Sequence, residues 1–181
     1  MKAMKKIILL VVVLVFCGGV LAISSEKSST DSKLRVGVYK SWVVALAHGR
    51  SKPHLEHINS LYAKAKKAEA DGDKETYEKL SFEMKELQKL MHLQVFGDEP
   101  IDECIEKIGP ALKEIAKEQN LDLITAKIFY DSEKIEQVDI TDLLVKQFEP
   151  DEKTMKMIEG MKNYKPLKRD ELLEAIRKDK I

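Results

Sequence analysis

Two helical stretches of similar length, joined by a very short break, constrain this 181-residue chain more than any other feature. The first begins at Pro53, since proline suits the first helical position. Its apolar residues mostly recur at steps of three and four: Leu55, Ile58, Leu61, Tyr62, Ala65 and Ala68. The second repeats close to a heptad seam: Tyr77, Leu80, Met84, Leu87 and Met91.

The break between these helices, Asp71–Asp73, contains a glycine and a candidate N-cap, Asp73. Helices joined by so short a connection fold back on each other as an antiparallel hairpin. The sequence therefore predicts a helical hairpin over residues 53–95.

Shorter elements flank the hairpin. Leu34–Tyr39 alternates apolar residues with Arg and Gly, which predicts a strand. Trp42–His48 predicts a short apolar helix, with Ser41 as its cap and Gly49 at its end. A further helix is expected from Ile101 to Gln119, with a bend at Gly109-Pro110 and Asn120 as its terminator.

The sequence of the last third of the chain predicts two strands and three helices. Leu121–Thr125 and Lys127–Tyr130 have the composition of strands, and Asp139 or Thr141 opens a helix that Pro150 stops. Residues 149–181 hold two weaker helical runs. We therefore expect a mostly helical α+β fold, in which a small β body carries an antiparallel helical hairpin.

Residues 1–22 have the pattern of a cleavable signal peptide. Three lysines precede an unbroken apolar run, Ile7–Phe16, and Ala22 suits the cleavage site. The run is too short for the alternative of an uncleaved anchor, because a membrane span needs about 20 apolar residues. Lipidation at Cys17 is disfavoured because Phe16 is not small. Ser-rich residues 23–33 predict a disordered linker, so we expect an exported protein without a membrane span after cleavage.

Charge and cysteine content exclude some functions. The 31 basic and 31 acidic residues balance, and losing three lysines with residues 1–22 leaves a net charge of about −3. That charge, without a basic tract, argues against nucleic acid as a partner. Cys104 would be the one remaining cysteine, so no intrachain disulfide can form. Its helical spacing from Ile101 and Ile108 predicts a buried thiol.

No residue pattern indicates catalysis or a cofactor. The chain has no phosphate-binding glycine loop and no nucleophile motif, so we expect no enzymatic activity and no cofactor. Asp71–Glu75 resembles the start of a calcium loop, but the required later glycine and glutamate are missing. Four histidines could approach one another and bind metal, or simply be partly exposed helix residues, and we favour the second interpretation: His48, His54, His57 and His92.

The segment Ile105–Phe148 resembles the end of a known family. A helix with Ala111 and Ala116 precedes a Gln-x-x-Asp-Leu step at Gln119, then a strand pair with Tyr130, then Asp139-Ile140-Thr141 before the last helix. This pattern is similar to that of the OmpH-like family of periplasmic chaperones, also called the Skp family. The resemblance covers residues 34–148 and is loose in the hairpin.

The resemblance implies a periplasmic homotrimer whose strands join into a small barrel, from which the hairpins extend and enclose unfolded outer-membrane proteins without ATP. The hairpin of this chain is shorter than those of the family, and residues 149–181 are an addition. Short strands also need partners to be stable, which agrees with assembly between subunits.

Two hypotheses about function follow. The first is an ATP-independent holdase that binds unfolded outer-membrane or envelope proteins, with client contacts at Tyr62, Met84 and Leu90. The second is an envelope structural or adaptor protein that binds one folded partner through its helical hairpin. Most of the apolar stripe is expected to pack the two hairpin helices together.

Overall fold

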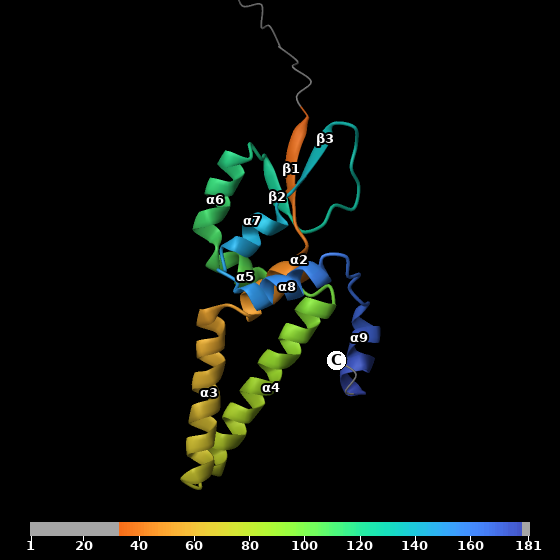
Figure 1. The fold of residues 1–181 in the computed structure, drawn as a ribbon. Helices are drawn as coiled ribbons and strands as arrows, with labels where there is room; N and C mark the ends of the chain where they lie inside the picture. Colours follow the sequence, from red (N-terminus) through yellow and green to blue (C-terminus); the bar gives the residue numbers. More distant parts are fainter. Residues whose placement is uncertain (1–32, 179–181) are drawn as a thin grey trace, which may run out of the picture. The chain divides into compact units, whose positions relative to one another are not determined.

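The computed structural model describes residues 33–178, so the predicted signal peptide and nearly all of the predicted linker lie outside the described residues. The described residues belong to a single unit of the chain. The predicted mostly helical α+β class is confirmed (Figure 1). The elements are β1 (Leu34–Val38), α2 (Ser41–Gly49), α3 (Lys52–Ala70), α4 (Lys74–Phe96), α5 (Asp102–Lys107), α6 (Gly109–Glu118), β2 (Leu123–Thr125), β3 (Ile135–Asp139), α7 (Thr141–Lys146), α8 (Glu152–Met161) and α9 (Arg169–Arg177).

The three strands pair with one another in the order β2-β1-β3, and both pairings are parallel. The prediction of a strand at Lys127–Tyr130 is wrong, because this segment is a loop in which Phe129 and Tyr130 are both exposed. The third strand is instead Ile135–Asp139. Its polar residues concealed it in the sequence, although Glu136 forms a cross-strand ion pair with Arg35 of β1.

The two faces of the sheet have different surroundings. Gly37 of β1 lies on the covered face, where a Cβ atom would approach Leu121 Cδ1 to 2.7 Å and Ile140 Cδ1 to 3.1 Å. The register places Leu34, Val36, Leu123 and Ile135 on the other face, which we call the outer face. Val36 is buried on this face, whereas Leu34 and Leu123 are exposed. Because glycine has no Cβ atom, Leu121 and Ile140 can pack closely against Gly37 on the covered face.

Helix α2 lies at the centre of the hydrophobic core. Its residues Val43–Ala47 are all buried, as expected for a helix that is apolar on every side. It packs against α4, α5, α7 and α8. The predicted end at Gly49 is confirmed, but the predicted cap is wrong: Ser41 is already helical, and Lys40 holds the N-cap position without a side-chain hydrogen bond.

Helices α3 and α4 lie side by side as the predicted hairpin (Figure 1). The predicted N-cap is confirmed, since Asp73 Oδ1 accepts a hydrogen bond of 3.1 Å from the Thr76 backbone N–H. The turn needs Gly72 because its φ is +74°. Helix α3 buries one stripe, formed by Leu61, Ala65 and Ala68.

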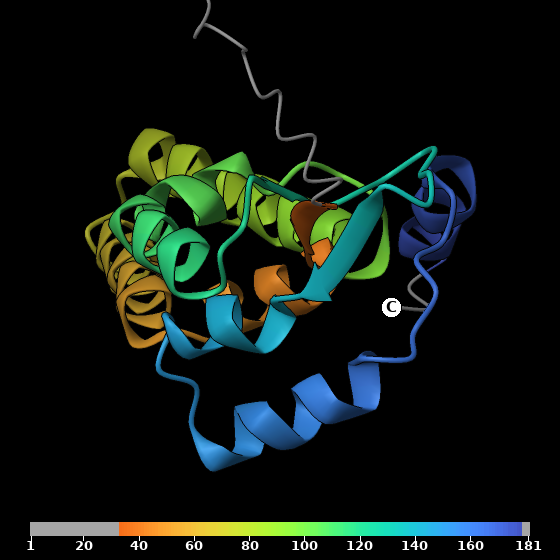
Figure 2. The same ribbon diagram turned by 90° about the horizontal axis from the view of Figure 1, so that it is seen from above.

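The C-terminal segment packs on both the core and the hairpin. Ile158 of α8 and Leu172 of α9 are fully buried. Trp42 Nε1 donates a hydrogen bond of 3.0 Å to the Met161 carbonyl, which fastens the end of α8 to α2. An extended segment then leads to α9 (Figure 2). Helix α9 contacts α4. We call the sheet with α2 and α5–α8 the body.

Candidate functional surfaces

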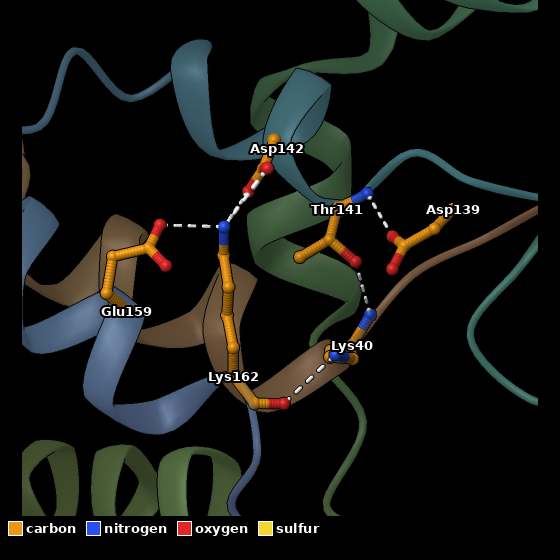
Figure 3. Close-up of polar contacts among 6 residues, drawn as sticks. All are labelled: Lys40, Asp139, Thr141, Asp142, Glu159 and Lys162. Atoms are coloured by element: carbon orange, nitrogen blue, oxygen red, sulfur yellow. Dashed lines mark hydrogen bonds and ion pairs between the residues drawn. The ribbon is translucent and has the colours of Figure 1, made fainter.

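The Asp139-Ile140-Thr141 sequence that carries the family resemblance forms a structural corner (Figure 3). Asp139 Oδ1 accepts a hydrogen bond of 2.9 Å from the Thr141 backbone N–H, and Thr141 Oγ1 accepts one of 3.1 Å from the Lys40 backbone N–H. Ile140 is fully buried, and its backbone N–H donates to the Val38 carbonyl. These residues therefore join β3 and α7 to the β1–α2 connection.

Lys162 extends this corner to α8 (Figure 3). Its Nζ lies 2.9 Å from Asp142 of α7 and 2.7 Å from Glu159 of α8. Its carbonyl accepts a hydrogen bond of 2.9 Å from Lys40 Nζ. Hydrogen bonds to Glu159 and Asp142 raise the pKa of Lys162. The C-terminal segment is thus tied to the same corner as the sheet.

The hairpin displays several apolar side chains to solvent. Of the three residues predicted to contact clients, Tyr62 is 65% exposed and Leu90 is 40% exposed, whereas Met84 is half-buried in the seam. The sequence analysis missed Phe82, which is 66% exposed. Phe82 lies off the seam formed by Leu80 and Met84, and this offset is the signal that could have identified it.

Phe82 and Leu90 line a groove of about 650 Å³ on α4, which also contains Leu87, Leu93 and, from α9, Arg169. We call it the α4 groove. Its other residues are charged and of both signs. Arg169 reaches the groove because it forms an ion pair of 2.6 Å with Glu99. The groove therefore combines an apolar floor with a rim that could orient a partner.

The sheet presents a second apolar surface. On its outer face, Leu34 is 46% exposed and Leu123 is 53% exposed. The loop after β2 adds Phe129 and Tyr130, 90% and 82% exposed. Strands β2 and β3 each pair on one side only, so both edges of the sheet are open within the described chain. Open edges next to exposed apolar residues are typical of surfaces that pair with another chain.

The histidines do not form a metal centre in residues 33–178, where no three His, Cys, Asp or Glu side chains come together suitably. His48 and His54 are in edge-to-face contact, with ring centroids 4.9 Å apart. His92 contacts the Phe96 ring instead. His57 is exposed on α3.

Cys104 is fully buried, as its spacing predicted. Burial, together with the nearby Glu103 carboxylate, raises the pKa of its thiol to about 12. Because the thiolate is the reactive form, this cysteine is inert near neutral pH while the chain is folded.

No family model, curated protein or solved structure matches this chain. None of the helices between residues 33 and 178 is long and apolar enough to cross a membrane.

Proposed function

We propose that this protein is an ATP-independent periplasmic holdase that binds unfolded outer-membrane or envelope proteins along its hairpin. The observation that carries the proposal is a set of apolar side chains on α3 and α4 that remain between 38% and 66% exposed. They are Leu55, Tyr62, Tyr77, Phe82 and Leu90. Spread along two helices, they offer many weak, adaptable contacts, which suit clients of varied sequence.

The body would serve as the base of an oligomer, and the OmpH-like resemblance suggests a trimer. The open sheet edges and the exposed residues Leu34 and Leu123 support self-association through the sheet. Assembly would place several hairpins around one client. Binding then lowers the free concentration of the unfolded chain and so opposes its aggregation.

Two measurements on residues 23–181 test these steps. Light scattering should give about three times the monomer mass, since the family resemblance implies a trimer and the open edges favour pairing. Dilution of a denatured outer-membrane barrel protein should produce less turbidity when the chain is in excess. A monomeric chain would refute the assembly, and unchanged turbidity would refute the holdase.

Two variants, one on the sheet and one on the hairpin, test separately which surface supports assembly and which supports client holding. Leu123→Lys places a charge on the outer face of the sheet and should weaken assembly, whereas Phe82→Lys should leave assembly intact and reduce client holding. Both parent residues are more than half exposed, so neither change should unfold the chain. Loss of assembly in Phe82→Lys would mean that the hairpin, not the sheet, joins the subunits.

The adaptor alternative has one specific observation in its favour. The α4 groove has charges of both signs around an apolar floor, a pattern suited to one helical partner of matching charge. A single folded protein recovered from envelope extract by the wild type, but not by Phe82→Lys, would favour the adaptor. Suppressed turbidity of several unrelated unfolded proteins would favour the holdase.

A further inference from the structure

Helix α9 covers the end of α4 that lies nearest the body. Leu172 of α9 is fully buried, and its Cδ2 lies 2.6 Å from the place of a Cβ atom at Gly97. Leu93 of α4 is 7% exposed, whereas Leu90, one turn earlier, is 40% exposed. Both Leu93 and Leu172 lie outside the hydrophobic core cluster around α2. The change from exposed to buried along this face of α4 therefore follows from the cover that α9 provides.

The contacts that hold α9 on α4 are those of a peripheral helix. Within α9, the buried residue is Leu172. Arg169 forms an ion pair with Glu99, but the arginine side chain is 66% exposed, and an ion pair this exposed stabilises little because water screens it. The Leu167 N–H, just before α9, donates a hydrogen bond of 2.8 Å to the Phe96 carbonyl. Helices held in this way open at a lower free energy than a packed core.

The α4 groove ends at α9. Leu93 and Arg169 line it together with Phe82, so its apolar floor continues from the exposed part of α4 to the part that α9 covers. Helix α9 also shows which chemistry this covered part accepts. Its leucine fills the recess at Gly97, where no Cβ atom intervenes, and its arginine, three residues earlier, pairs with Glu99. A segment of another chain with an aliphatic and a basic side chain at this spacing would fit the same place.

We propose that α9 is an autoinhibitory helix that competes with unfolded clients for α4. Docked, it occupies the body end of an apolar surface that runs from Phe82 to Gly97. Released, it opens this whole surface to an apolar client segment that carries a basic residue. The inference rests on the proposed holdase for the identity of the client, and it adds where on the hairpin the client binds and what limits its access.

Releasing α9 should strengthen client binding, because a competitor lowers the apparent affinity by the fraction of molecules in which it is docked. Leu172→Asp places a carboxylate in the apolar contact with α4 and should release α9. We expect this variant to bind a fluorescently labelled, denatured outer-membrane barrel protein about threefold more tightly, or better. The matched control is Arg177→Asp, which introduces the same group at an exposed position of α9 and should bind like the wild type.

Locking α9 should have the opposite effect. Glu99→Cys and Arg169→Cys are combined in the 23–181 chain and joined by a short bis-maleimide. Cys104 does not compete for the reagent because it is fully buried. The cross-linked chain should bind the client about threefold more weakly than the same variant with both new thiols blocked by N-ethylmaleimide. Equal affinity of the cross-linked and blocked chains would overturn the proposal, as would unchanged or weaker binding by Leu172→Asp.

Two further measurements separate this proposal from the holdase itself. Hydrogen exchange of Leu172→Asp should be faster in α9 and unchanged in α2, and simultaneous opening of α2 would overturn the proposal. Titration with the apolar dye ANS reads the α4 surface without a client. Stronger dye binding in Leu172→Asp that is lost again in Leu172→Asp/Phe82→Lys supports the autoinhibitory contact, even where no chain binds the client and the holdase fails. Unchanged dye binding in Leu172→Asp overturns it.

Discussion

The body and the distal part of the hairpin differ sharply in how they are stabilised. In α2 the five residues Val43–Ala47 are each 7% exposed or less. In α4 no residue from Lys74 to His92 is buried, and burial begins at Leu93. Tertiary packing therefore holds the body, whereas the far half of the hairpin depends on one apolar seam and on its own helical hydrogen bonds. Regions of this second kind open locally at lower free energy than a packed core.

The largest effect that tests this contrast should come from the core. Leu144→Ala in α7 removes a fully buried side chain, so we expect it to lower the free energy of unfolding by about 2–5 kcal/mol. Leu87→Ala at a half-buried hairpin position should cost only about 1 kcal/mol. Urea unfolding of both variants measures the difference. Equal costs would mean that the hairpin is as well packed as the body.

The second-largest effect on stability should come from acid, at the junction of the body and the hairpin. Burial, Lys107 and His54 lower the pKa of His48 from 6.5 to about 4. The unfolded chain therefore takes up a proton before the folded chain does. The stabilising contribution of neutral His48 is complete above pH 6.5 and is lost as the pH falls from 6.5 towards 4, by at most about 3 kcal/mol.

This contribution is measured by urea unfolding at several pH values in the wild type and in His48→Gln. The wild type should lose more stability than the variant between pH 7 and pH 4.5. The matched control is His57→Gln on exposed α3, which should follow the wild type. Parallel curves for the wild type and His48→Gln would contradict the burial of a neutral imidazole.

A smaller effect is expected where α9 meets α4. A Cβ atom at Gly97 would lie 2.6 Å from Leu172 Cδ2 and 2.7 Å from the Leu93 carbonyl oxygen. The carbonyl belongs to the backbone and cannot easily move, so Gly97→Ala should destabilise the chain by about 1–3 kcal/mol. Gly160→Ala is the control, because nothing lies within 4 Å of its added Cβ and alanine favours the helix.

Thermal unfolding of both glycine variants provides the measurement. A lower midpoint for Gly97→Ala, together with an unchanged or higher midpoint for Gly160→Ala, is the expected pattern. If Gly97→Ala were neutral, the contact between α9 and the base of the hairpin would not contribute to stability.

The smallest effects should come from two matched helix caps, one in each region. Asp73 accepts the Thr76 backbone N–H, and Asp151 accepts the Thr154 backbone N–H at 2.7 Å. Hydrogen bonds from these threonines lower the pKa of both aspartates, so each cap acts above the usual aspartate pKa and is lost as the pH falls through its lowered value.

Hydrogen exchange distinguishes the two caps. Asp73→Ala should accelerate exchange only at the start of α4, because that end of the hairpin opens by itself. Asp151→Ala should accelerate exchange at the start of α8, whose Thr154 and Ile158 are buried in the body. Faster exchange of α2 amides in Asp73→Ala would show that the hairpin and the body open together.

The sequence predicted those elements whose signal is local. Apolar spacing and the Asp71–Asp73 break identified the hairpin, and the spacing around Cys104 identified a buried thiol. The strand β3 was missed because its polar residues Glu136 and Gln137 occupy a sheet edge, where burial imposes no apolar pattern. The strand conformation of that segment is determined by its long-range pairing with β1.

The candidate surfaces were predictable only in part. Tyr62 and Leu90 are exposed as a client surface requires, but Phe82, which is 66% exposed, was overlooked. The α4 groove could not be foreseen, since Arg169 is distant in sequence and reaches it only when α9 docks.

The placement of β1 has a consequence for how the chain is made. The first strand of the described chain is the middle strand of the sheet, and its partner positions Leu123 and Ile135 lie some 87 and 101 residues later. Closing such long loops is slow, whereas the hairpin needs only neighbouring residues. A chain emerging from its N-terminus can therefore complete its two long helices well before β1 finds either of its partner strands.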